Sequence, residues 1–599
     1  MTSAVLRDRA RTVCTACHDR KVKCDLDERL PGICSNCRRF DHRCVKRINR
    51  RQRVRQDLAI QTERDTPTGP ASNRSITVEQ SSPQSGFIAQ HSVLACDGSP
   101  DLPAPPSAPW LSPSVRHVVI SATGATTLVA PALRSALTDL YFEHLFHHYP
   151  VVDPGELSVA DPSILLQQAV CLVGNLMRHG AEHMHLSYGL YEKVKTLIFL
   201  NYEADPVITL KAVCLMSCWS AQRPDTICMD GPWYWTGVSI RLAVQMGLHR
   251  ESTYASKPRS GCLRRIFWQL HNADKFQVAC WGRPPLLRSV YVDANLPCLS
   301  DFDEPGVQAR VFIYETRLCD IMGHIAELHL EKQDISIEVL TGIQGALEIW
   351  IRELPAELRL YSSSGTRQRF SHPVSDLHIQ YFACIILLEL LQGEVTAQHN
   401  TSLVSLISSS CMARLFEEIL LREHTRFLLP LTGFVSMAAA LPQIYYRPED
   451  REGATARHEA IEILCSVMEH MRGKYGGADM VLSKIRTLQS AVEQARLPAH
   501  DVEASPSAIP HRDYGNLQHP FNLNLKGLFP FPESLSLHLG EARYRGHAYV
   551  PRDDLPAGSI APMSHMWAQW IESDGFEFMD MANMSGMSDV VSAGASLEG

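Results

Sequence analysis

The chain has 599 residues and a formal net charge of −8, with 57 Lys and Arg against 65 Asp and Glu. Its length and its hydrophobic fraction of 45% suffice for a large buried core, which excludes a wholly disordered or fibrous protein. Residues 1–60 carry sixteen basic and seven acidic side chains, a net charge of +9, which leaves −17 for the remainder. This asymmetry is typical of a basic nucleic-acid-binding module attached to an acidic body.

Six cysteines near the N-terminus follow the spacing C-x2-C-x6-C-x9-C-x2-C-x6-C, as two similar halves joined by a loop. They are Cys14, Cys17, Cys24, Cys34, Cys37 and Cys44. Two intervening residues is the spacing at which paired cysteines bind one ion. Two tetrahedral zinc ions need eight sulfur positions, and six cysteines fill them only if two sulfurs bridge both ions. The spacing therefore predicts a binuclear cluster with two zinc ions as the cofactor.

Other interpretations of the six cysteines fit less well. A disulfide framework belongs to small secreted chains, and no apolar signal segment precedes Cys14. Iron-sulfur motifs bring cysteines closer together than Cys14 to Cys24, and a RING-type site needs a histidine ligand, whereas His18 and His42 lie off the pattern. The twelve remaining cysteines, such as Cys171, stand in apolar segments and are interpreted as reduced core residues of an intracellular protein.

Basic side chains surround the cysteines. The segment from Cys17 to Cys24 is expected to be a short helix held by metal at both ends, and its cations are suited to the guanine O6 and N7 acceptors of the major groove. Cations of the second half, including Arg43, are expected near phosphates. Six more cations follow in residues 45–55; they are suited to gripping phosphates or to nuclear import, and a merely solvated charge run is the alternative. The predicted DNA contacts are Arg20, Lys21, Lys23, Arg38, Arg39, Arg50 and Arg51.

The segment from Cys14 to Cys44 resembles the Zn2Cys6 binuclear-cluster domain of fungal transcription factors. The resemblance implies that Cys14 and Cys34 are the bridging sulfurs. It implies further that Cys17 and Cys24 complete one ion and that Cys37 and Cys44 complete the other. Lys21 matches the position that reads the guanine-rich half of a CGG-type triplet in double-stranded DNA. The resemblance also implies a nuclear protein.

The next part of the chain changes from a linker to helices. Residues 57–131 are rich in Pro, Ser, Thr and Gly, which predicts a disordered linker, and no heptad repeat follows the cluster, so homodimerisation stays open. From residue 133 to about 497, apolar residues recur with helical periodicity, and Gly247 and Gly282 are expected to end two of the helices. Further helices are expected at 133–147, 165–177, 207–220, 310–330, 335–352, 377–391, 404–422, 458–472 and 480–495. Residues 427–446 lack charge but contain two prolines, which favours a buried helix over a membrane span.

Three stretches of this helical region, residues 231–250, 264–268 and 282–285, resemble the fungal-specific transcription factor domain, also called the middle homology region. The resemblance covers roughly residues 135–390 and is greatest to a cutinase-regulator-like branch. It implies a regulatory role, either holding activity in check or sensing a metabolite, and it carries over no catalytic residue.

The sequence does not favour an enzyme. His144 and His148 are spaced to share a helix face, but no carboxylate stands in a convincing third-ligand position, so no metal site is predicted there. His183 and His185 invite the same interpretation without further support. The chain lacks a G-x-S-x-G motif, a P-loop and a G-x-G-x-x-G motif. Charged residues of the helical region are expected on helix surfaces or in buried pairs rather than as catalysts: Asp274, Arg264 and Arg283.

The final segment is acidic. Residues 553–599 contain eight acidic residues, no Lys or Arg, and aromatic side chains such as Trp567 and Trp570. This composition is typical of a disordered activation segment that binds a coactivator, and a tail that packs back on the helical domain is the alternative.

The sequence thus predicts a mainly α protein. Residues 1–56 are the Zn2Cys6 DNA-binding domain with a basic extension, 57–131 a disordered linker, 132–500 an all-α regulatory domain and 501–599 a largely disordered acidic tail. The predicted function is a nuclear, sequence-specific activator of a fungal metabolic or secondary-metabolite gene cluster. The alternatives are a repressor, or an activator of lipid or cutin utilisation genes gated by a small-molecule effector. No membrane partner is expected.

Overall fold

The computed structural model forms two compact units, Met1–Gln84 and Ser85–Gly599. It describes residues 14, 17, 20, 22, 24, 34–40, 44, 86, 87, 89, 111–178, 180, 183–256, 259–331, 335–396, 402–448, 450–496 and 525–540. The first unit is called the cluster unit below, and the second is called the helical unit.

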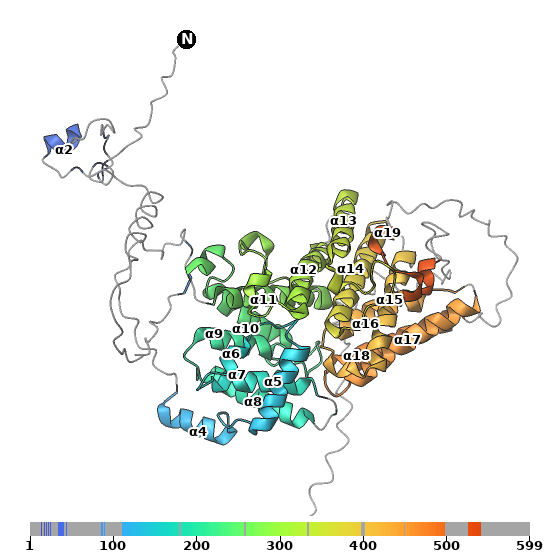
Figure 1. Cartoon of the computed structure of the whole chain (residues 1–599), viewed down its shortest axis with the longest axis horizontal. Coiled ribbons are helices and arrows are strands. Elements are labelled where there is room, and N and C mark those ends of the chain that lie inside the picture. The colour runs from blue at the N-terminus through green and yellow to red at the C-terminus, as the bar shows by residue number, and fades with distance from the viewer. Residues whose placement is uncertain are drawn as a thin grey trace, which may run out of the picture. The chain divides into compact units, whose positions relative to one another are not determined.

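Helices make up nearly all of the regular structure in the described part of the helical unit (Figure 1). The earlier ones are α4 (Pro113–Thr123), α5 (Pro131–His144), α6 (Pro154–Leu157), α7 (Ile164–Leu176), α8 (Met184–Phe199), α9 (Pro206–Met216), α10 (Pro232–Gln245) and α11 (Ser260–Trp281). The later ones are α12 (Val307–Glu331), α13 (Ile337–Glu353), α14 (His372–Thr396), α15 (Leu403–Leu421), α16 (Thr432–Tyr445), α17 (Arg451–Met471), α18 (Gly477–Arg496) and α19 (Leu525–Leu528). Among the described residues, β pairing is limited to one isolated antiparallel bridge between Tyr361 and Arg367. The predicted mainly α fold is confirmed.

Glycine ends the two helices for which the sequence predicted it. Gly282 follows α11 with a φ of 61° and donates its N–H to the carbonyl of Val278, and Gly247 lies just after α10 with a φ of 78°. These left-handed conformations favour a residue without a Cβ atom. Helix α8 was not predicted, although Leu190, Val194 and Leu197 form a buried stripe at helical spacing.

The helical unit has two hydrophobic cores. The first lies among α5, α7, α8, α9, α10 and the N-terminal halves of α11 and α12, and the second lies among α13 to α18 and the C-terminal halves of α11 and α12. Helices α11 and α12 pack along each other and stand between the two groups in Figure 1. Phe267 belongs to the first core and Phe276 to the second, although both lie on α11. The pair α11 and α12 therefore connects the two cores.

The most apolar helices are interior helices. Among the described helices, α14 has one window, His372–Leu391, long and apolar enough to cross a membrane, and 89% of that window is buried inside the fold. Helix α16 occupies the uncharged stretch at residues 427–446, and every one of its residues is buried, Pro442 included. A buried helix was the prediction for that stretch.

Two segments differ from the predicted linker and tail. Helix α4 lies inside the predicted linker, residues 57–131. Ser112 caps its first turn, Pro113 is its first residue, and Gly124 ends it with a φ of 57°. Phe87 also belongs to the helical unit: its N–H donates to the carbonyl of Gln245 at 2.7 Å, and its ring meets His249 edge-on at 4.9 Å. The linker prediction extended too far at both places.

Within the predicted tail, residues 525–540 pack on the second core. Phe529 stacks on Phe382 of α14 at 6.3 Å, Phe531 lies 5.4 Å from the same ring, and the hydroxyl of Tyr381 donates to the carbonyl of Leu528. Prolines interrupt this apolar segment, so no periodicity revealed it. The predicted activation segment at 553–599 lies outside the described residues.

Candidate metal centre and nucleic-acid interface

The six predicted zinc-binding cysteines lie together in the cluster unit. Five of them are buried, and Cys44 packs against them half-buried. Their sulfur atoms are close: Cys14 Sγ lies 3.8 Å from Cys34 Sγ and 3.6 Å from Cys37 Sγ, and Cys17 Sγ lies 3.5 Å from Cys34 Sγ. Tetrahedral zinc with Zn–S bonds of about 2.3 Å holds neighbouring sulfurs about 3.8 Å apart. The geometry of the thiols therefore fits zinc.

The two halves of the sequence repeat have the same local structure. In the first half, the N–H of Cys17 donates to Cys14 Sγ at 3.4 Å, and the N–H of Cys14 donates to Cys24 Sγ at 3.5 Å. In the second half, the N–H of Cys37 donates to Cys34 Sγ at 3.4 Å, and the N–H of Cys34 donates to Cys44 Sγ at 3.4 Å. Such N–H donors stabilise negative charge on sulfur. The identical cysteine spacing thus produces the same pair of N–H···Sγ hydrogen bonds in both halves.

The thiols differ in acidity because they occupy different places in this network. For Cys34, burial raises the pKa, but the N–H of Cys37 and the neighbouring thiols outweigh that rise and lower it to about 6. For Cys37, burial and the neighbouring thiols all act upward and raise the pKa to about 12. The pKa of Cys14 is lowered in the same way as that of Cys34, since burial is outweighed by the N–H and thiol of Cys17. The two sulfurs that favour the thiolate most are the first cysteine of each half.

Several predicted DNA contacts surround the cluster on its exposed side. Arg38 and Arg39 stand exposed in the last turn of the short helix α2 (Ser35–Arg39), which begins directly after Cys34. Arg20 is exposed as well, and its guanidinium lies 5.3 Å from the ring of Phe40, while that of Arg39 lies 5.7 Å from the same ring. Phe40 thus bridges cations of both halves. The other predicted contacts lie outside the described residues: Lys21, Lys23, Arg43, Arg50 and Arg51.

In the helical unit, Asp274 and Arg283 hold the segment at residues 282–287 against the neighbouring helices. Asp274 on α11 is fully buried and accepts the N–H groups of Leu286 and Leu287 at 2.9 to 3.1 Å. Burial raises the pKa of Asp274, and these two N–H groups act against that rise. The guanidinium of Arg283 contacts the rings of both Trp233 and Trp281, at 5.0 and 5.2 Å. Each contact joins residues 282–287 to α10 or α11.

Arg264, on the same helix, makes an ion pair at the start of α11. It donates to both carboxylate oxygens of Glu251, at 2.7 and 3.0 Å, and its guanidinium lies 4.2 Å from the ring of Tyr254. The prediction of surface or pair residues therefore describes Arg264. It was wrong for Asp274, which is buried and accepts backbone N–H groups, and Arg283 contacts two tryptophan rings.

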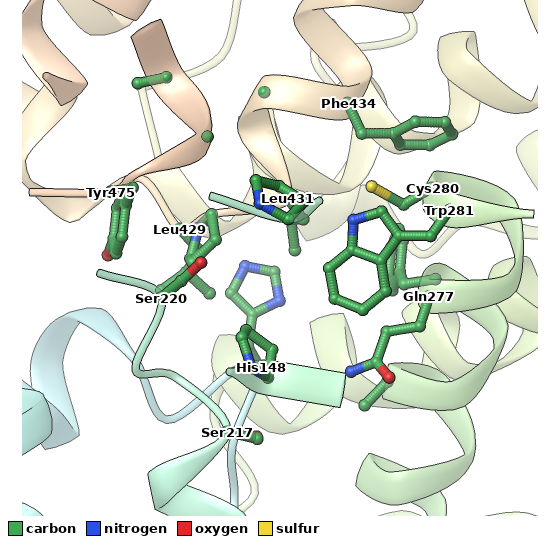
Figure 2. A pocket seen from close by; sticks show the side chains of 18 of the residues that line it. His148, Ser217, Ser220, Gln277, Cys280, Trp281, Leu429, Leu431, Phe434 and Tyr475 are labelled. Atoms are coloured by element: carbon green, nitrogen blue, oxygen red, sulfur yellow. The ribbon is translucent and has the colours of Figure 1, made fainter. Parts of the chain in front are cut away.

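A cavity of about 130 Å³ lies in the helical unit where the two cores meet. Figure 2 shows side chains from α11, α16 and the segments after α5, α9 and α17 around this space, among them His148, Gln277, Trp281, Phe434 and Tyr475. Most of the lining is apolar. No sequence motif indicated the cavity, because its residues come from segments up to 333 positions apart, between His148 and Val481.

Polar atoms in the cavity wall lack hydrogen-bond partners. Within the described residues, the unpaired atoms at the cavity are Gln269 Oε1, Asn272 Oδ1, Gln277 Oε1, Glu315 Oε2 and the hydroxyl of Tyr475. Each of these residues is at least nine-tenths buried. Unpaired buried polar atoms cost free energy, and several around one cavity are typical of a binding site.

Comparison with known proteins finds a family match for each of the two parts of the chain. Residues 12–53 match the family described as the fungal Zn(2)-Cys(6) binuclear cluster domain, and residues 138–366 match the family described as the fungal specific transcription factor domain. The chain combines these two domains. The binuclear zinc centre and the second domain predicted from the sequence are thereby confirmed.

The chain is similar to an acetamidase regulatory protein of Aspergillus oryzae, at 30% identity over 345 residues, which is 53% of this chain and 43% of the relative. It is also similar to the acetamidase regulatory protein of Emericella nidulans, at 29% identity over 50% of this chain and 40% of the relative. Cutinase transcription factor 1 alpha of Fusarium vanettenii is 25% identical over 45% of this chain and 32% of that protein. These alignments span less than half of each relative's length.

Proposed function

We propose that this protein is a nuclear transcription factor that binds DNA sequence-specifically and only with zinc in its cluster unit. The observation that carries the proposal is the set of sulfur distances, 3.5 to 3.8 Å, around Cys14 and Cys34. Zinc would supply no chemistry here. Its role is to fold a short segment that has too few apolar residues for a core, and zinc-finger peptides gain about 10 to 16 kcal/mol from metal binding.

The proposed ligand set places Cys14 and Cys34 between two ions, with Cys17 and Cys24 on one and Cys37 and Cys44 on the other. Two observations support it. Cys14 Sγ, in the first half, lies near two sulfurs of the second half, and Cys34 Sγ, in the second half, lies near two sulfurs of the first. The same two thiols have lowered pKa values, because each accepts hydrogen bonds from a backbone N–H and from neighbouring thiols.

Within this proposal, the basic residues have two roles. Lys21, with Arg20 and Lys23 beside it, contacts base edges of a CGG-type triplet, because it lies between two metal-bound cysteines. Arg38, Arg39, Arg50 and Arg51 contact phosphates and set affinity rather than sequence preference. The exposed positions of Arg20, Arg38 and Arg39 support this assignment.

The test is selection of bound oligonucleotides by the full-length, zinc-loaded protein. We expect enrichment of CGG-type triplets. Lys21→Ala should lose about 1 to 3 kcal/mol on the best site and flatten the preference, whereas Arg38→Ala should weaken all sequences alike and lower the salt slope by about one. Lys526→Ala, in the helical unit, is the matched control and should bind as the parent does. A zinc-loaded protein that enriches no motif would overturn the proposal.

The targets we infer are genes of metabolic enzymes. The sequence left a secondary-metabolite cluster and lipid or cutin utilisation as alternatives. A relative named for cutinase regulation supports the second kind of target, and relatives named for acetamidase regulation support genes of metabolic enzymes in general. Activation, rather than repression, is inferred from the acidic and aromatic composition of residues 553–599, which would bind a coactivator. Genome-wide occupancy of the tagged protein, together with reporter expression driven by residues 553–599 on a neutral DNA-binding module, tests both points.

A second function, binding of a small-molecule effector, is supported by the cavity of the helical unit. Among the described residues, acceptor oxygens on four side chains of the cavity wall lack donors: Gln269, Asn272, Gln277 and Glu315. A small apolar molecule with N–H or O–H groups would therefore match the site. Differential melting of the full-length protein with a panel of small amides, amines and hydroxy acids tests this function. Stabilisation that is lost in Gln269→Leu supports it, and no stabilisation by any member at millimolar concentration contradicts it.

A further inference from the structure

A cluster of histidine and carboxylate side chains lies buried in the helical unit, far in sequence from the six zinc-binding cysteines. His147 and His148 follow the end of α5, and Asp376 lies in the first turns of α14. The Nε2 atoms of His147 and His148 approach Asp376 Oδ2 at 3.6 and 3.5 Å. The three side chains are 1%, 9% and 14% exposed, and one donor atom from each lies within 4.8 Å of the other two.

These distances fit ligands of one metal ion better than they fit hydrogen bonds. N–H···O hydrogen bonds are about 2.7 to 3.2 Å long, which is shorter than both contacts. Zinc binds imidazole nitrogen and carboxylate oxygen at about 2.0 to 2.2 Å, so its tetrahedral neighbours stand about 3.4 Å apart. The observed separations of 3.5 and 3.6 Å are close to that value.

A second carboxylate, that of Glu315, lies on the far side of the His148 ring and orients that ring. Glu315 Oε1 on α12 lies 2.8 Å from His148 Nδ1, and Gln380 Nε2 donates to the same oxygen at 2.9 Å. When Nδ1 of His148 donates to Glu315, its Nε2 lone pair points toward Asp376. Metal-bound histidines commonly donate their second N–H to a carboxylate in this way. A divalent ion would also balance the charges of the two buried carboxylates.

A protonated His148 between Glu315 and Asp376 is the alternative without metal. It leaves His147 unexplained, because neither nitrogen of this buried ring has a hydrogen-bond partner among the residues that the structure describes. His372 lies one turn before Asp376, and its Nε2 is 3.3 Å from Asp376 Oδ2. Within the described part of the chain, neither nitrogen of His372 has a hydrogen bond. A buried imidazole without any partner costs free energy, which a metal ion at His147 would remove.

We propose that His147, His148 and Asp376 bind one zinc ion, with Glu315 as the outer partner of His148. Three protein ligands leave a fourth position for water or another donor, as in zinc sites that take exogenous ligands. Because His148 and Glu315 line the cavity, a cavity ligand with a donor atom could complete the site. This third zinc is independent of the two in the cluster unit and of DNA binding.

The experiment is metal analysis of the untagged, full-length protein after dialysis against metal-free buffer. We expect three zinc ions per chain. An organomercurial reagent should release the two thiolate-bound ions and leave the third, which EDTA then removes. With cobalt in place of zinc, the third site should show d–d bands without the sulfur-to-cobalt charge transfer of the cluster.

Variants locate the third ion. Asp376→Asn and His147→Gln should each hold two zinc ions, and His144→Gln is the matched control, three residues from His147, which should keep three. Two ions in the parent protein with zinc present, or three ions in Asp376→Asn and His147→Gln, overturn the inference. Loss of the DNA-binding function with a retained third ion would affect only the proposal for the cluster unit, so the two failures are distinguishable.

Discussion

Gly174 marks a close helix crossing in the first core. It lies on α7 against α5, and a Cβ atom placed on it would stand 2.0 Å from the carbonyl oxygen of Leu137 and 2.7 Å from the carbonyl carbon. Ordinary contacts between such atoms need about 3.5 Å, so α5 would have to move by about 1.5 Å. The obstacle is backbone rather than a flexible side chain, and Leu137 and Tyr141 of α5 are fully buried.

The size of the effect follows from two opposing terms. Replacing Gly by Ala inside a helix gains about 1 kcal/mol of helix propensity. Overpacking a close-packed core costs about 1 to 3 kcal/mol and more when the backbone must shift. Because the obstacle is backbone, the cost lies at the upper end of that range, and we expect Gly174→Ala to lose about 2 kcal/mol of unfolding free energy.

Gly342→Ala is the matched control, because Gly342 lies on α13 and a Cβ atom added to it would meet no neighbouring atom within 4 Å. It should gain about 0.5 to 1 kcal/mol. Urea unfolding of the full-length protein, followed by far-UV circular dichroism, measures both variants. Equal stability of the two variants, or a stabilised Gly174→Ala, would refute the close approach of α5 and α7.

Three further predictions concern single side chains. Burial raises the pKa of Glu389 to about 7, so the folded state keeps a proton that the unfolded state loses, and the stability of the fold decreases as pH rises from about 4.5 to 7. Because the residue keeps some solvent contact, Glu389→Gln should gain only about 1 to 2 kcal/mol of stability at pH 8 and nothing at pH 4, as measured by thermal melting. Glu156→Gln should lose about 3 to 5 kcal/mol, because it leaves the fully buried Lys211 without its partner. Lys211→Met should stay within about 1 kcal/mol of the parent, and a Glu156→Gln variant as stable as the parent would contradict the pairing. Phe531→Ala should weaken the docking of residues 525–540 by about 3 kcal/mol, visible as faster hydrogen exchange in that segment with α7 unchanged.

The sequence predicted those features that depend on residues close together in the chain. The six cysteines span 31 positions, and their spacing alone required shared sulfurs. The ends of α10 and α11 were predictable as well. Gly247 and Gly282 adopt the left-handed conformation that often ends a helix, and this conformation depends on the residues next to them in the chain. The spacing of the cysteines therefore predicted the zinc cluster, and the periodicity of apolar residues together with the terminal glycines predicted a mainly helical fold.

Contacts between distant residues could be recognised only in the tertiary structure. Asp376 stands 229 positions from His147, so the carboxylate that the histidines lacked in the sequence arrives from another helix. The same holds for Phe531 on Phe382, and for the polar atoms around the cavity. Helical periodicity tells which face of each helix is buried, but not which other face covers it. The cluster was thus determined by the sequence, whereas the histidine site, the cavity and the docked segment were decided by the packing of α5, α11, α12 and α14.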